Sequence, residues 1–146
     1  MPFSRRLPFA HGRRRHTPGS INKDEASYRD YLDLRIRLGE IMWRSEHEGV
    51  KIKLTKDLHY TIDFAVLAND GILEFHDVKG SKKNKSKQKD GTIKDLGHKA
   101  YIEDDALVKL KIVAETWPVR VMIVYKVQGN WMVKQVGGED EPEGQS

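Results

Sequence analysis

The stretch TIDFAVLANDGILEFHDVKG, residues 61–80, has the apolar, β-branched and aromatic composition of two strands joined by a polar turn. The pattern predicts strands over residues 58–67 and 72–79. Each carries an acid where a strand usually holds an apolar residue, Asp63 in the first and Asp77 in the second. Lys79 follows Asp77 by two positions, so both side chains share one face. The hairpin therefore presents two carboxylates and an ammonium group that require an explanation.

The length of the turn decides whether the two carboxylates meet. A two-residue loop at 70–71 would place Asp63 opposite Val78. A three-residue loop at 69–71 would place Asp63 opposite Asp77, and it suits a type I turn closed by a left-handed glycine. In that register the two backbones are only about 5 Å apart. We expect the three-residue loop.

Two carboxylates that face each other across a strand pair repel, so they need a cation between or beside them. Lys79 is one such cation and a divalent metal is a stronger one. Carboxylate oxygens suit Mg²⁺, for which Mn²⁺ can substitute. Glu25, at the head of the inward stripe of the first predicted helix, could complete the cluster. It could equally be a first-turn acid that interacts with the helix dipole, and Asp77 with Lys79 alone would be an ordinary surface ion pair.

The rest of the hydrophobic pattern predicts a mixed α/β layer in the order helix, three or four strands, helix, one or two strands. The first helix is expected from Ser20 or Asn22 to residue 38, with capping-box spacing between Asn22 and Glu25 and an end at Gly39. The remaining predicted elements are strands at 40–43 and 50–54, a helix at 102–117, and strands at 119–127 and 131–136.

Positive charge is concentrated in two segments of a chain whose net charge is only +4. We divide the chain into a flexible basic arm at 1–19, a domain at 20–136 with a lysine-rich loop at 81–99, and an acidic disordered tail at 137–146. Such segregation favours a polyanionic partner, usually nucleic acid, although either run alone could be a solvated tail. The candidate backbone-binding residues are Arg13, Arg14, Arg15, Lys82, Lys83, Lys85, Lys87, Lys109 and Lys111.

Other classes of site and location are disfavoured by composition. The chain has no cysteine, which excludes disulfides and thiolate metal sites and fits a cytoplasmic setting. No apolar run approaches the roughly 18 residues of a membrane span, so we expect no membrane association. The six histidines are scattered and predict no histidine metal site. The three tryptophans fall within predicted elements and are expected in the core.

In order and spacing, these motifs resemble the PD-(D/E)XK nuclease superfamily. Asp63 and the run Asp77-Val78-Lys79-Gly80 match its signature, with Ile62 in the variable proline position. Within that superfamily the chain is similar to small phage nucleases of the endonuclease I, Holliday-junction-resolving type. Those proteins also have an acid on the first helix, a Tyr-Thr-x-Asp-Phe strand at the equivalent of 60–64, and a later helix with Lys-x-Lys, here 109–111. The resemblance covers about residues 20–127. Glu74 could be confused with the second acid, but it falls on the opposite strand face from Asp77.

The resemblance implies a restriction-endonuclease-like core, a mixed sheet flanked by helices, and Mg²⁺-dependent hydrolysis of DNA phosphodiesters. Glu25, Asp63 and Asp77 would hold the metal with the carbonyl of Val78. Lys79 would position or deprotonate the attacking water, or offset transition-state charge. Branched DNA in recombination or DNA processing is the implied substrate, the cytoplasm of a phage host the implied location, and a homodimer is plausible. Two alternatives stay open: a nucleic-acid-binding protein that keeps the fold without the chemistry, and an accessory protein that holds a protein partner.

Overall fold

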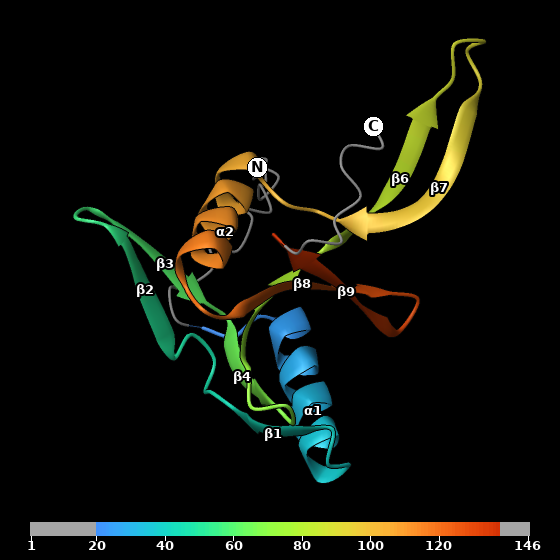
Figure 1. The fold of residues 1–146 in the computed structure, drawn as a ribbon. Coiled ribbons are helices and arrows are strands. Elements are labelled where there is room, and N and C mark those ends of the chain that lie inside the picture. Colours follow the sequence, from blue (N-terminus) through green and yellow to red (C-terminus); the bar gives the residue numbers. More distant parts are fainter. Residues whose placement is uncertain (1–19, 138–146) are drawn as a thin grey trace, which may run out of the picture.

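A five-stranded mixed sheet forms the centre of the structure (Figure 1). The computed structural model describes residues 20–137; the predicted basic arm, with Arg13, Arg14 and Arg15, and nearly all of the acidic tail lie outside the described residues. Strand order is β1-β4-β5-β8-β9, with β5 parallel to β8 and all other neighbours antiparallel. These strands are β1 (Ile41–Arg44), β4 (Phe64–Ala68), β5 (Leu73–Lys79), β8 (Arg120–Val127) and β9 (Asn130–Val136).

Two helices cover opposite faces of this sheet: α1 (Lys23–Arg37) and α2 (Asp104–Thr116) (Figure 1). Tyr28 and Leu32 of α1 are buried against Phe64, and Leu110 of α2 is buried in a second cluster with Ala65. Adjacent residues of a strand point to opposite faces, so Phe64 and Ala65 serve the two cores separately. The mixed α and β class predicted from the sequence is confirmed.

The first helix begins as its sequence predicts. The Asn22 side chain accepts a hydrogen bond from Glu25 N, and the Glu25 side chain accepts one from Asn22 N, both at 2.9 Å. Leu38 caps the other end, and Gly39 follows with φ +77°. Glu25 is 7% exposed, so the inward direction expected for it is confirmed.

The hairpin of β4 and β5 has the three-residue loop. Ala65 pairs with Phe75 and Leu67 with Leu73. Ala68 N donates to Ile72 O at 3.1 Å, and Gly71 adopts φ +81°. The predicted register, which brings Asp63 to the level of Asp77, is therefore confirmed.

The single strand predicted at 58–67 is wrong, because the chain bends at Asp63. β3 (Leu58–Ile62) pairs only with β2 (Val50–Thr55) in a separate two-stranded sheet, and β4 then joins the main sheet. Ile62 and Phe64, on either side of the bend, are both fully buried in different clusters. The change of partner leaves Asp63 at the junction of the two sheets.

The loop predicted at 81–99 is also wrong. It forms an antiparallel hairpin of β6 (Ser81–Lys87) and β7 (Ile93–Ala100), which projects away from the domain (Figure 1). Gly91 has φ +86° in the tip, and Gly97 has φ +85° at an irregularity in the pairing. The polar, glycine-containing composition of this segment predicted a loop, although its backbone forms regular strand pairs.

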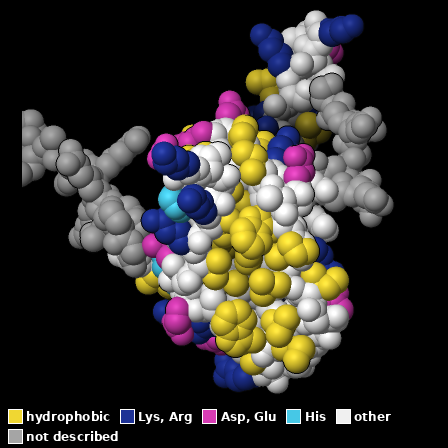
Figure 2. Space-filling model, turned by 60° about the vertical axis from the view of Figure 1, so that its left-hand side comes forward, with side chains coloured by type: hydrophobic (Ala, Val, Ile, Leu, Met, Phe, Trp, Pro, Cys, Tyr) yellow, Lys and Arg dark blue, Asp and Glu magenta, His cyan; other side chains and the backbone are white. Residues whose placement is uncertain are grey.

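Hydrophobic side chains form a broad exposed band on one side of the molecule (Figure 2). Trp43 and Trp117 are 49% and 45% exposed, so the expectation that they lie in the core is wrong; Trp131 is partly buried against the α1 cluster. Among residues 20–137, no helix is both long and apolar enough to cross a membrane.

Candidate metal centre

Asp63 is held in place through both its main chain and its side chain. Its carbonyl accepts a hydrogen bond from Glu48 N at 2.9 Å, and its Oδ2 accepts one from Val78 N at 2.7 Å. The second bond directs the carboxylate across the hairpin toward β5, immediately beside Asp77. Only 8% of the residue is exposed. Asp63 is thus a buried acid fixed at the bend between two sheets.

Glu25 reaches the same point from the first turn of α1. Its Oε2 accepts the capping hydrogen bond from Asn22 N and also lies 2.9 Å from His47 Nε2. The two interpretations of this acid that the sequence leaves open are therefore not exclusive. Glu25 caps the helix and also belongs to the cluster.

His47 is the residue that sequence reasoning missed. It lies in the turn between β1 and β2, which is tied to β4 by Ser45 N donating to Ala65 O at 2.7 Å and Ala65 N donating to Ser45 Oγ at 2.8 Å. Gly49 is needed in this turn, since a Cβ there would lie 2.9 Å from Glu46 O. No local pattern marks His47, because long-range pairing between β1 and β4 places it.

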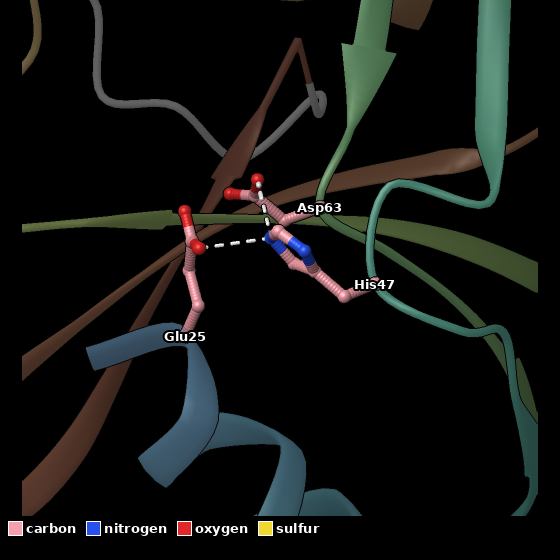
Figure 3. A group of neighbouring side chains, drawn as sticks. All are labelled: Glu25, His47 and Asp63. Atoms are coloured by element: carbon pink, nitrogen blue, oxygen red, sulfur yellow. Dashed lines mark ion pairs between the residues drawn. The ribbon is translucent and has the colours of Figure 1, made fainter. Parts of the chain in front are cut away.

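Together these residues form a triad of possible metal ligands: Glu25, His47 and Asp63 (Figure 3). Their donor atoms all lie within 4.8 Å of one another, and His47 Nε2 is 3.8 Å from Asp63 Oδ1. His47 Nε2 is buried and, among the described residues, makes no contact with hydrogen-bond geometry. A buried nitrogen of this kind, facing two carboxylates, is suited to bind a cation.

Asp77 and Lys79 form an ion pair next to the triad. Lys79 Nζ lies 2.8 Å from Asp77 Oδ2, and the Asp77 side chain is only 4% exposed. The phenol of Tyr60, on β3, also faces Asp77: burial and then the Asp77 charge raise the pKa of Tyr60 well above its ordinary value. The site thus has a second buried carboxylate that already has a cation of its own.

The electrostatics of the metal-free site follow from burial and repulsion. Burial, followed by the negative charge of Asp77, raises the pKa of Asp63 to about 9, so Asp63 carries a proton at neutral pH. Burial alone would lower the pKa of Lys79, but the Asp77 carboxylate outweighs it and the pKa is raised. Lys79 is therefore an ammonium group in the metal-free protein.

An open pocket adjoins this ammonium group. Its volume is about 360 Å³, and it lies between the end of β5 and the start of α2. It is lined by Val78, Lys79, Gly80, Tyr101, Glu103 and Ala106. The pocket gives a ligand access to Lys79 from solvent.

The structure brings together the four residues predicted to be catalytic, Glu25, Asp63, Asp77 and Lys79. Glu74, the acid that the sequence analysis rejected, lies elsewhere. Glu74 pairs with Arg120 at 2.8 Å and with His76 at 2.9 Å, away from Asp77. Val78 is buried, and its use as a carbonyl ligand stays a prediction. Lys111 is exposed on α2 and Lys109 is partly buried. The other described candidates for DNA binding, Lys82, Lys83, Lys85 and Lys87, all lie on β6.

Comparisons with protein-family models, with curated proteins and with solved structures found no match to this chain.

Proposed function

We propose that this protein is a metal-dependent endonuclease that hydrolyses phosphodiester bonds of DNA, with branched or structured DNA as its substrate. One observation carries the proposal. Three donor groups from α1, the β1–β2 turn and the β3–β4 bend converge within 4.8 Å, directly beside the ion pair of the buried Asp77 with Lys79. Segments far apart in sequence are thus arranged to bring carboxylates together, and a bound divalent cation would offset their charge in place of the proton that Asp63 holds in the metal-free protein.

The order of the elements supports a PD-(D/E)XK-like core. A helix with an acid precedes an antiparallel hairpin that carries Asp63 and the Asp77-x-Lys79 run, and a second helix then leads to a strand parallel to β5. The three-residue turn aligns Asp63 with Asp77, so the two acids that match the PD-(D/E)XK signature lie next to each other.

The donor set fits a divalent ion. An ion held by Glu25, His47 and Asp63, with Asp77 beside it, would supply an acidified water and positive charge for the phosphate oxygens. The other catalytic and positioning roles would be performed by residues of the protein. Lys79, which pairs with Asp77, would orient the phosphate or the attacking water, deprotonate that water, or stabilise negative charge in the transition state. Val78 N holds Asp63 in the orientation that this requires.

His47 alters the expected metal preference. Two carboxylates alone favour Mg²⁺, whereas an added imidazole nitrogen favours first-row transition ions. We expect Mn²⁺ to bind more tightly than Mg²⁺, and His47→Ala to lower Mn²⁺ affinity by at least about tenfold with a smaller effect on Mg²⁺. Isothermal titration of both ions into both proteins measures this. His59→Ala, on the exposed side of β3, is the matched control. Equal losses for the two ions would remove His47 from the ligand set.

The function itself is tested by strand cleavage. Purified protein is incubated with supercoiled plasmid, linear duplex and a four-way junction, in Mg²⁺, in Mn²⁺ and in chelator. We expect metal-dependent cutting, fastest on the junction. Metal-dependent cutting without preference for the junction would support the nuclease activity and contradict the proposed preference for branched DNA. Binding without cutting in any divalent ion would favour the nucleic-acid-binding alternative.

A further inference from the structure

The projecting hairpin of β6 and β7 carries more net positive charge than the whole chain. Residues 81–100 hold seven lysines and two aspartates, a net charge of +5 against +4 for all 146 residues. Every residue of this hairpin is exposed or only partly buried. Ala100, at the base of the hairpin, packs against the α2 cluster, but the rest of the ribbon is free. A free two-stranded ribbon is only marginally stable in water, so packing does not explain the length of this element.

Both acids of the hairpin have local structural partners. The Asp90 carboxylate accepts hydrogen bonds from Thr92 N at 2.9 Å and Thr92 Oγ1 at 2.6 Å in the tip. The Asp95 carboxylate accepts one from Gly97 N at 2.9 Å, where the pairing is irregular. Within residues 20–137, none of the hairpin lysines forms an ion pair, so their charges are available to a ligand.

The strand register divides six of the lysines equally between the two faces of the ribbon. Lys83, Lys85 and Lys87 alternate along β6 and share one face. Lys82 lies on the other face, opposite Lys99, and Ser86 on that face pairs with Lys94. Directly opposed lysines such as Lys82 and Lys99 destabilise a ribbon, and a bound polyanion relieves their repulsion.

The spacing and the two charged faces indicate the shape of that polyanion. Lysines two positions apart on a strand are separated by about 7 Å, which is comparable to the separation of successive phosphates along a nucleic-acid strand. Charge on both faces suits a ribbon that lies in a groove between two backbones, and a major groove admits a two-stranded ribbon. Residues 81–100 contain no Phe, Tyr or Trp on which unpaired bases could stack; Tyr101 follows at the base of the hairpin, where Lys82 Nζ lies 5.0 Å from its ring centroid.

From this arrangement we infer that the β6–β7 hairpin is an arm that inserts into a groove of duplex DNA and contacts the phosphates on both sides. The inference rests on the proposed action of the protein on DNA, and it specifies a duplex beside the scissile phosphate. Only Gly80 separates the arm from Lys79. The seven residues of β6 span about 23 Å, so the arm covers about seven base pairs to one side of the cut.

The test measures binding without chemistry. Affinity for a labelled 20-base-pair duplex and for one of its strands is measured in chelator over a range of salt concentrations. Three charge-matched variants of the full chain are compared: Lys83, Lys85 and Lys87→Gln; Lys82, Lys94 and Lys99→Gln; and, as control, the exposed Lys51, Lys53 and Lys134→Gln. Thermal unfolding checks that each variant folds.

We expect each hairpin variant to reduce the slope of log affinity against log salt on duplex by about 2.7, close to 0.9 for each lost phosphate contact, and the control to change it little. We also expect the wild-type protein to prefer the duplex to the single strand. An effect confined to one face, a single strand bound as tightly as the duplex, or a control that loses as much slope would each overturn the inference. The binding test contains no metal and does not depend on chemistry. A protein that binds duplex in this way but does not cleave DNA would therefore overturn the proposed nuclease function and leave this inference standing.

Discussion

Asp63→Asn is expected to lower strand cleavage by at least about a hundredfold, since loss of one preorganised group already has that effect. The same change is expected to stabilise the metal-free protein. Asparagine resembles the protonated acid that the folded protein holds, keeps an oxygen for the hydrogen bond from Val78 N, and removes the repulsion with Asp77. Plasmid nicking and thermal unfolding in chelator measure the two effects. Asp57→Asn, at an exposed turn residue, is the control.

The stability of the metal-free protein should depend on pH through the same group. The pKa of Asp63 is 3.8 ordinarily and about 9 in the fold, so the unfolded chain releases this proton at a lower pH than the folded protein. The contribution of this proton to stability is therefore full below about pH 4, falls as pH rises towards 9 and then levels off. Asp63→Asn should flatten this profile. A wild-type profile that rises over the same range would contradict the assignment of the proton.

Lys79→Met is expected to separate metal binding from catalysis. Loss of a group that orients or stabilises the reacting atoms lowers cleavage by about 10²-fold or more, whereas the carboxylates that would bind the ion stay in place. In chelator the variant leaves the buried Asp77 carboxylate without its cation, which destabilises the fold by about 3 kcal/mol. A divalent ion should restore much of this stability.

Cleavage rates, metal titration and unfolding with and without the ion measure these effects. Lys53→Met, at an exposed position of β2, is the matched control. Metal affinity that falls in parallel with activity would show that Lys79 supports the metal centre itself. Activity within tenfold of wild type would exclude Lys79 from the reaction.

Local sequence rules predicted the helix cap, the turn and hence the alignment of Asp63 with Asp77. Each of these depends on residues that lie within a few positions of one another: Asn22 with Glu25, and residues 69–71 between two strands. The bend at Asp63 was missed because an unbroken β-prone run does not reveal that its two halves pair with different strands. His47 was missed because its place in the site depends on β1 pairing with β4, about 25 residues away in sequence.

The lysine-rich hairpin shows a different limit. Its residues have little β-propensity, and polar composition ordinarily indicates a loop. Its two strands are instead paired through their backbones. Asp90 and Gly91 form the turn and Gly97 lies at an irregularity in the pairing, and none of these residues produces an alternating hydrophobic pattern. The charge of this segment predicted a polyanionic partner, and the regular two-stranded shape favours duplex DNA as the form of that partner.

The Glu25 carboxylate closes the first turn of α1 and lies in the triad at the same time. Binding of a ligand to the triad and the stability of the first turn of α1 are therefore thermodynamically coupled. A ligand that leaves the contact with Asn22 intact must tighten the helix, and by reciprocity a tighter helix must hold that ligand longer. A ligand that draws Glu25 away must fray it.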